Sequence, residues 1–342
     1  MNSTTWKTRT SSDSPINTSK PPPPGRFFYN KEDPMYDSEL FAKARLFIYH
    51  NARALDLARW RFHFEGADKS EVLAALSAYQ NKDGGFGWGL EADAWNPNSS
   101  PIQTCTATEI LDETAFSDTQ HPIIQGILAY LESGSSFDGS FWYKAIPSTN
   151  DHPHAPWWAC TDNSTGNGDY NPTAALAGFL FRHAKGNAQR ELLAIRIVKE
   201  AYDQLLGGGR ENGFHTVICY LRMHDYLSQI PRKSPIDLQE LASTLVVAVD
   251  SLVEQDSDAW INSYSCKPSH FHRASQRLFT PLLQDLGHKE CTQIKQTQCA
   301  DGSWAPTWAW ADYPEQWAVA KLWWKSDLII RNLLFLRSMH AL

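Results

Sequence analysis

The chain has 342 residues, of which 42% are hydrophobic and 20% charged, as is typical of a soluble globular protein with a sizeable core. Its formal net charge of −7 at pH 7 argues against nucleic acid as a partner and leaves at most peripheral membrane contact. No stretch approaches the roughly 20 apolar residues of a membrane-spanning helix. The six cysteines are scattered without a CxxC pair, which favours a reduced, cytoplasmic protein without a cysteine-rich metal site. We expect no cofactor.

Residues 1–34 differ in composition from the rest of the chain. They are rich in Ser, Thr, Pro and Lys, contain four consecutive prolines at 21–24 and have almost no aliphatic side chains. Such a segment buries too little apolar surface to offset the entropy of ordering, so we predict that it is disordered. It also lacks the basic, apolar and small-residue regions of a signal peptide. We expect one folded domain over residues 35–342.

The rest of the chain has helical patterns almost throughout. Apolar residues recur three and four positions apart, as in Leu73, Leu76 and Tyr79. Asp68 has the position of an N-terminal cap, and Pro235 that of a helix opening. These patterns predict an all-α fold. Twelve helices in six pairs are expected, over residues 37–63, 69–81, 102–118, 121–134, 172–186, 188–206, 211–229, 235–255, 268–286, 287–299, 315–324 and 326–340.

Four long connections, at 83–101, 135–171, 256–267 and 300–314, interrupt the helical rhythm. Loops of this length in a compact domain are usually functional or disordered. Their composition is not that of disorder, because several of them are rich in tryptophan. We therefore look for the functional residues there.

One short turn recurs along the chain. It stands at 80–88 (QNKDGGFGW), 138–141 (DGSF) and 298–304 (QCADGSW), with a fainter copy at 211–214 (ENGF). Asp and Gly favour a tight turn, because Gly reaches positive φ without steric cost and Asp bonds its own backbone. The following aromatic can then fold back over the preceding helix. Repetition of such a unit predicts an array of similar units that bury their apolar faces against one another.

The copies at 80–89 and 298–304 resemble the QW-type repeats of squalene–hopene and oxidosqualene cyclases, and related Gly-Gly-Phe turns occur in protein prenyltransferase β-subunits. The resemblance covers about residues 40–342. It implies an α/α toroid, in which six inner and six outer helices surround a central, largely apolar cavity. The turn is more specific for the fold than for any one chemistry.

The acid motif of these cyclases has only a degenerate match. The family resemblance implies an Asp-x-Asp-Asp-Thr-Ala motif whose middle Asp protonates an alkene or epoxide, and the nearest stretch is 169–174 (DYNPTA). Asp169 matches the first Asp, but Asn171 occupies the place of the proton donor, and an amide cannot serve as that acid. The equivalent stretch in the first repeat, 102–107, has no acid. We therefore expect a non-standard acid.

The sequence also lacks a clear motif for the metal-dependent chemistry of the related families. Asp112 and Glu113 lack a partner acid at the spacing of a DDxxD metal–diphosphate motif, and the zinc site of prenyltransferases cannot be placed. His270, His272 and Cys299 have side chains that can ligate a metal, but such residues are more often solvated or packed. We predict no metal site.

Three clusters in the long loops contain the candidate site residues: 91–96 (EADAWN), 151–169 and 308–315 (WAWADYPE). A carboxyl beside Trp in a shielded pocket acquires the raised pKa that a general acid needs. We expect Asp93, Asp169 and Asp312 as candidate acids, with His154 as their partner. Aromatic faces stabilise cations, which suits carbocation chemistry. The predicted substrate-binding residues are Trp88, Trp95, Trp157, Trp158, Tyr170, Asn171, Trp308 and Trp310.

Several hypotheses fit these features. The leading one is an enzyme that resembles terpene cyclases and performs acid-initiated cyclisation or isomerisation of an apolar polyene or prenylated small molecule. A second is a non-catalytic toroid that binds an isoprenoid, a lipid or a partner protein. A third is a carbohydrate-active toroid with paired carboxylates and Trp platforms. The residues also fit structural roles, since Glu91 and Asp312 suit helix caps or ion pairs and Asp169 suits an N-terminal cap.

Overall fold

The computed structural model describes residues 36, 38–161, 170–207 and 212–341. Within them the regular elements are helices, and β-pairing is limited to isolated bridges, so the all-α prediction is confirmed for this part of the chain. The segment 1–34, predicted to be disordered, lies outside the described residues. The helices are α1 (Glu39–Asn51), α2 (Ala54–Phe64), α3 (Lys69–Ser77), α4 (Pro101–Glu113), α5 (Pro122–Glu132), α6 (Thr173–Arg182), α7 (Ala188–Leu206), α8 (Phe214–Ser228), α9 (Leu238–Leu252), α10 (Ala259–Asn262), α11 (Pro268–Ala274), α12 (Pro281–Gln296) and α13 (Pro314–Ser338), with the 3₁₀ turns η2 (Pro147–Asp151) and η3 (Pro156–Trp158).

Most helices begin where the sequence supplies a cap. The Asp68 carboxylate accepts from the backbone N–H of Ser70 at 2.8 Å, as predicted for α3. Helix α9 begins at Leu238 and not at Pro235, because the side chain of Asp237 caps it. Side-chain caps satisfy backbone donors that have no partner within the helix.

The predicted helices differ most from the structure at three places, and the connection expected at 256–267 also contains the short helix α10. The expected helix 37–63 is two helices, because Ala52 and Arg53 are extended. The Arg53 guanidinium bonds Asp56 and the carbonyls of Gly89 and Leu90, which ties this break to the loop after the first turn. The break expected near 286 lies instead at 275–280, between α11 and α12.

The two helices expected at 315–324 and 326–340 are one helix, α13. Residues 324–326 contain neither Pro nor Gly. Ser326 donates its hydroxyl to the Leu322 carbonyl one turn earlier, which leaves the backbone helical. The result is a helix of 25 residues that runs along much of the molecule.

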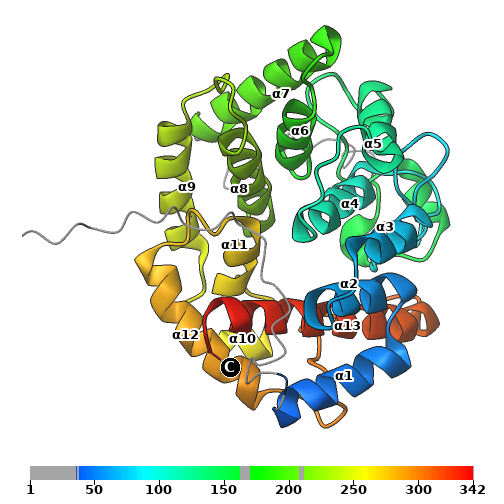
Figure 1. Ribbon diagram of the computed structural model, residues 1–342, viewed down its shortest axis with the longest axis vertical. Helices are drawn as coiled ribbons and strands as arrows, with labels where there is room; N and C mark the ends of the chain where they lie inside the picture. Colours follow the sequence, from blue (N-terminus) through cyan, green and yellow to red (C-terminus); the bar gives the residue numbers. More distant parts are fainter. Residues whose placement is uncertain (1–35, 37, 162–169, 208–211, 342) are drawn as a thin grey trace, which may run out of the picture.

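Contacts between helices follow a series that returns to its start. Helix α4 contacts α6, α6 contacts α8, α8 contacts α11, α11 contacts α13, and α13 contacts α2. Arg59 on α2 then bonds both carboxylate oxygens of Glu113 on α4, at 2.8 and 2.7 Å. Helices α1, α3, α7, α9 and α12 each pack against one or two members of this series. In Figure 1 the helices follow one another around the molecule, and α13 lies beside α2 and α1.

The recurring turn has the same construction at both ends of the chain. Gln80 donates to the Gly84 carbonyl at 2.9 Å and to the Ile123 carbonyl of α5 at 3.0 Å. Gln298 does the same with Gly302 at 3.0 Å and with Leu40 of α1 at 2.9 Å. Each Gln thus fastens its own turn to the first residues of another helix.

The glycines of these turns permit close approach of a neighbouring backbone. Gly84 and Gly302 have φ of +88° and +87°, and a Cβ on either would lie within 2.3 Å of a carbonyl oxygen, of Gly126 or Lys43 respectively. Only glycine fits such a position. The aromatics that follow, Phe86 and Trp304, are buried, as the pattern predicts.

Candidate active site

A cavity of about 1680 Å³ lies between the helices of the contact series. Its lining comes mainly from α2, α4, α8, α11 and α13, with further residues from α6, α10 and α12 and from the loops near 91–93, 157–158 and 304–308. A cavity of this size can hold a small molecule of substantial length. Aromatic and aliphatic side chains make up part of its wall, and charged side chains form a belt across it.

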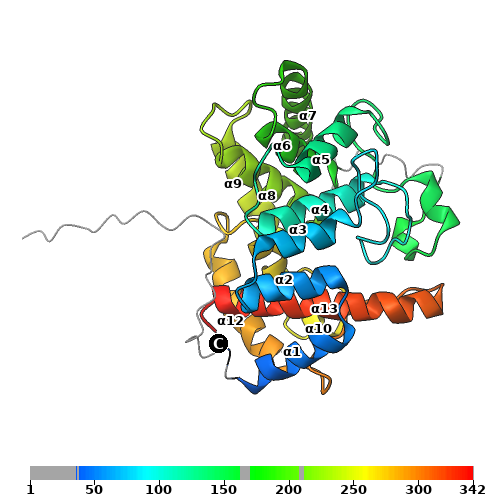
Figure 2. The same cartoon turned by 45° about the vertical axis from the view of Figure 1, so that its right-hand side comes forward.

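The three Trp-rich loops meet at Asp93. The backbone carbonyl of Asp93 accepts from Ala155 N at 2.8 Å, and Trp95 N donates to the Pro153 carbonyl at 2.9 Å. The side chain of Trp310 reaches the same residue from the third loop. Figure 2 shows the loops after α3 and α5 on the side where α13 begins. Loops far apart in the sequence therefore assemble one site.

Two indoles hold the Asp93 carboxylate. Trp310 and Trp324 donate their Nε1–H to Asp93 Oδ1, at 2.7 and 2.6 Å. Trp308 lies near enough to favour the ionised carboxylate, although outside hydrogen-bonding geometry. Burial nevertheless dominates and raises the pKa of Asp93 to about 6, because a charge loses hydration there, while the indole donors lower it.

Glu91 is the neighbouring acid of Asp93. Burial and, second, the Asp93 charge raise the pKa of Glu91 to about 8, against a smaller lowering by the Arg331 charge. The two carboxyls titrate as a pair, and the proton of this pair stays on Glu91 near neutral pH. Two carboxyls with different environments and separated pKa values are the usual arrangement of a general acid and its partner.

The loop that carries Glu91 is fixed from both sides. Arg53 on α2 donates to the carbonyls of Gly89 and Leu90, immediately before Glu91. On α4, Gln103 accepts from Leu90 N at 2.9 Å and donates to the Asn96 carbonyl at 3.1 Å. The acid is therefore placed by a rigid loop, as positioning of a catalytic group requires.

An aromatic wall faces the two acids. The rings of Trp308 and Trp324 meet edge to face, with centroids 5.1 Å apart, and Trp308 meets Tyr264 in the same way at 5.5 Å. All three residues line the cavity. Tyr264 shares a 2.6 Å hydrogen bond with His215 Nε2. Such ring faces attract cations by about 0.5–2 kcal/mol each.

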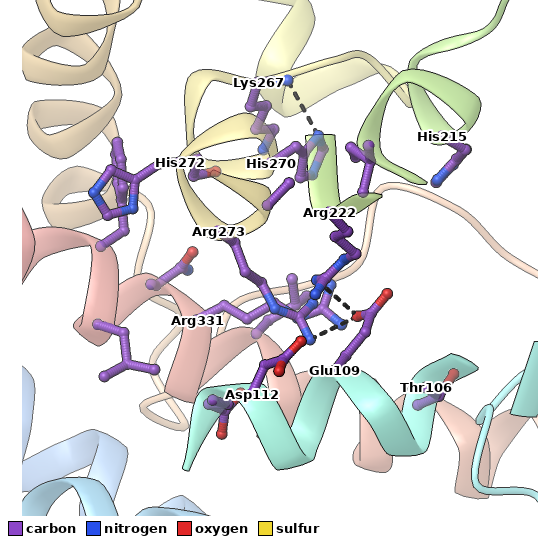
Figure 3. A pocket seen from close by; sticks show the side chains of 18 of the residues that line it. Thr106, Glu109, Asp112, His215, Arg222, Lys267, His270, His272, Arg273 and Arg331 are labelled. Carbon is purple, nitrogen blue, oxygen red and sulfur yellow. Dashed lines mark hydrogen bonds and ion pairs between the residues drawn. The ribbon is translucent and has the colours of Figure 1, made fainter. Parts of the chain in front are cut away.

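A belt of charges crosses the cavity from α4 to α8, α11 and α13. Glu109 Oε2 accepts from Arg222 at 3.2 Å and from Arg273 at 3.0 Å (Figure 3). Arg331 lies beside them and pairs with Asp327 at 2.6 Å. The arginine charges hold the pKa of Glu109 below its ordinary value although burial raises it. This belt differs from the largely apolar cavity that the family resemblance implies.

A second network of buried charges ties α2 to α4 and α13. Arg59 is 2% exposed and bonds Glu113, Asp56 and Asp327 at 2.7 to 3.1 Å. His63 completes it with a 2.9 Å contact to Glu113. Every charge in this group has a partner, so we assign it a structural role.

The predicted site residues fall into three groups. Asp93, Trp157, Trp158, Asn171 and Trp308 line the cavity. The other described ones are not among the lining residues: Trp88, Trp95, His154, Tyr170, Trp310 and Asp312. Asp169 lies outside the described residues. Glu211, the first residue of the fainter turn at 211–214, also lies outside them.

Residues away from the cavity wall have other surroundings. Trp88 is 59% exposed, and its indole donates to Asn81 at 2.8 Å. Trp95 stacks on Trp323 at 4.9 Å behind Trp310. Asp312 is exposed at the surface, so it is not the acid in a shielded pocket that the sequence predicted.

His154 and Tyr170 belong to the structure around the site. His154 Nδ1 contacts the His152 carbonyl at 2.7 Å, and its backbone pairs with Ala94 next to Asp93. Tyr170 is buried, with its ring 6.3 Å from that of Tyr220. His154 therefore lies beside the loop of Asp93 and its ring does not line the cavity.

Sequence reasoning missed the acid and the arginines of this site. Glu91 belongs to the predicted cluster 91–96 but was not chosen as a candidate acid. Only the structure shows that it lines the cavity and lies near the charge of Asp93. Arg222, Arg273 and Arg331 are separated by more than fifty residues along the chain and form no motif. For α4, the sequence offered one signal: Glu109, Asp112 and Glu113 are three and four positions apart, so they share one face of the helix.

Metal-binding geometry is absent from the part of the chain that the structure describes. No group of three or more His, Cys, Asp and Glu side chains there could hold a metal ion, and this covers His270, His272 and Cys299. The six cysteines, all within the described residues, form no disulfide bond. No described helix is long and apolar enough to cross a membrane.

Comparisons of the chain with protein-family models, with curated proteins and with solved structures find no match in any of the three. The likeness to terpenoid cyclases thus stays a prediction from the turn motifs. The geometry of the cavity is the evidence for its function.

Proposed function

We propose that this protein is an enzyme that catalyses acid-initiated cyclisation or isomerisation of a polyene or prenylated small molecule, in a cavity enclosed by an α/α toroid. The inner helices of this toroid are α2, α4, α6, α8, α11 and α13, and the outer ones α1, α3, α5, α7, α9 and α12. The contact series that returns from α13 to α2 supports this arrangement. The resemblance of residues 80–89 and 298–304 to QW-type repeats supports it independently. The free cysteines are compatible with a cytoplasmic enzyme.

The observation that carries the proposal is the Glu91–Asp93 pair in a cavity with an aromatic wall. A carboxylic acid with a pKa of about 8 keeps its proton at neutral pH and can donate it within the cavity. In the reaction, the Glu91 O–H bond breaks and the π electrons of a substrate double bond form a new C–H bond. The adjacent carbon becomes a cation.

The cation then reacts without a further co-reactant. In a cyclisation, a second double bond supplies the electrons for a new C–C bond. A C–H proton next to the last cation finally leaves to the Glu91 carboxylate, directly or through water, and the acid is restored. Tyr264, Trp308 and Trp324 present ring faces that stabilise the positive charge during these steps.

Asp93 acts as a positioning residue for the acid. Its carboxylate is held by Trp310 and Trp324, and its charge disfavours ionisation of Glu91. The reacting acid therefore stays protonated until substrate arrives. Replacement of Asp93 by Asn should lower the pKa of Glu91 and weaken the orientation of both indoles.

The carboxyl pair also favours a second candidate, a carbohydrate-active enzyme. Glycosidases use two carboxyls on opposite sides of the scissile bond, with Trp as stacking platforms. Glu91 and Asp93 are the acids we assign to such a role, because Glu109 and Glu113 are bound by arginines. Turnover of a glycoside and none of an isoprenoid would favour this candidate.

The test is incubation of the protein with linear C10–C30 isoprenoids, followed by mass spectrometry and product isolation. We expect a product with the mass of its substrate, which is the signature of cyclisation or isomerisation. Glu91→Gln should abolish it, and Glu315→Gln, which changes an exposed glutamate, should not. Full turnover by Glu91→Gln would contradict the assignment of the acid.

A further inference from the structure

Three arginines from three helices converge on one side of the cavity. Arg222 belongs to α8, Arg273 to α11 and Arg331 to α13, and all three line the cavity. In Figure 3, Arg222 and Arg273 reach the same carboxylate, Glu109, and Arg331 lies next to Arg273. The acid-initiated mechanism uses none of these guanidinium groups.

The nearby carboxylates leave this cluster with an excess of positive charge. Asp112 pairs with Arg182 at 3.2 Å, and Asp327 is shared between Arg331 and Arg59. Glu109 alone therefore serves two guanidinium groups, Arg222 and Arg273. Glu91 adds no charge at neutral pH, because it holds its proton.

The three guanidinium groups differ in burial, because the side chains of Arg273 and Arg331 are 26% and 30% exposed. Arg222 is 6% exposed, and its Nε–H has no acceptor among the described residues. Burial and, second, the Arg331 charge lower the pKa of Arg273 to about 10, against the raising effect of Glu109. Taking an uncompensated charge out of water is costly, so a buried site of this kind favours the arrival of an anion.

Guanidinium groups recognise oxyanions in a defined way. Each presents several N–H donors in a planar fork that matches the oxygens of a carboxylate or a phosphate. The forks of Arg222 and Arg273 offer more N–H donors than the two oxygens of Glu109 can accept, and Arg331 lies beside them.

We propose that Arg222, Arg273 and Arg331 form a binding site for an oxyanion, a carboxylate or phosphate group of the molecule that the cavity holds. The site adjoins the indoles that hold Asp93, because the Arg331 guanidinium lies over the ring of Trp324, 5.7 Å from its centroid. The ligand is then an apolar molecule with one anionic end. This site goes beyond the proposed acid chemistry and can be tested without turnover.

The experiment is calorimetric titration of the full-length protein with inorganic phosphate and, separately, with acetate, at constant ionic strength set by sodium chloride. We expect saturable binding of at least one of them, and the two arms distinguish phosphate from carboxylate recognition. Arg273→Gln should weaken that binding by about 10-fold or more, as loss of a charge-assisted hydrogen bond implies. Arg196→Gln, at an exposed arginine paired with Glu200, is the matched control and should bind as the wild type does.

A second variant makes the test independent of whether Arg273→Gln folds. Glu109→Gln removes the carboxylate that competes for Arg222 and Arg273, so anion binding should tighten several-fold. Glu91→Gln should bind the anion like the wild type, which separates this site from the proposed acid. Absence of saturable binding in the wild type, or unchanged affinity in Glu109→Gln, would overturn the proposal.

Discussion

The ionisation of Glu91 should appear in the stability of the protein even before a substrate is known. The pKa of Glu91 is raised from an ordinary 4.5 to about 8, chiefly by burial. The folded protein thus holds a proton that the unfolded chain releases above about pH 4.5. The stability that this proton contributes is present at low pH and is lost as the pH rises towards 8.

The size of this effect follows from the displacement of the pKa. One pKa unit corresponds to 1.36 kcal/mol, so the full interval sets an upper bound of about 5 kcal/mol. Glu91 is partly exposed to the cavity, and water there screens its charge, so we expect roughly 2 kcal/mol. Gln does not ionise, and Glu91→Gln should therefore lose this part of the pH dependence.

The assay is urea unfolding of wild type and Glu91→Gln at pH 5 and pH 9, followed by tryptophan fluorescence. The wild type should lose about 2 kcal/mol more free energy of unfolding between the two pH values than the variant does. Glu315→Gln, at an exposed position, should follow the wild type. An equal loss in wild type and Glu91→Gln would refute the raised pKa of Glu91.

Two further predictions concern the fold. Gly302→Ala places a Cβ 2.3 Å from the Lys43 carbonyl oxygen at a φ of +87°, so it should lower the free energy of unfolding by about 3 kcal/mol or more. Gly139→Ala has open space around the new Cβ and should lower it by about 1 kcal/mol. Equal losses of the two variants in thermal unfolding would contradict this. Arg59→Met leaves Glu113 without its main buried partner and should lower the free energy of unfolding by about 3–5 kcal/mol. Arg61→Met removes one partner of a largely exposed pair and should lower it by less than about 1 kcal/mol. Similar losses of the two variants in chemical unfolding would argue against the buried network.

Much of the fold was predictable because its rules are local. The turns at 80–88 and 298–304 have short-range chemistry, in which Gln and Asp bond the backbone within a few residues. Helical periodicity located nearly every helix for the same reason. The boundaries that differed depend on tertiary contacts, as in the break at Arg53, whose guanidinium is held by the loop at Gly89 and Leu90.

The candidate site was only partly predictable because its chemistry depends on residues far apart in the chain. Asp93 was expected from its Trp-rich loop, and so were Trp308 and Trp310, but Trp324 was not among the predicted site residues. Glu91 becomes an acid only through burial and the charge of Asp93, which no sequence pattern encodes. Arg222 and Arg273 meet Glu109 across more than a hundred residues of sequence.

The central claim is that Glu91 donates a proton to a carbon atom of the substrate. Its most direct test is turnover of a linear isoprenoid in D₂O, with mass spectrometry of the isolated product. A carboxylic acid that is accessible to water exchanges its proton with D₂O between turnovers. We therefore expect each product molecule from the wild type to carry one deuteron on carbon, and Glu91→Gln to form no product. A product that carries no deuterium, formed equally by Glu91→Gln, would contradict the account.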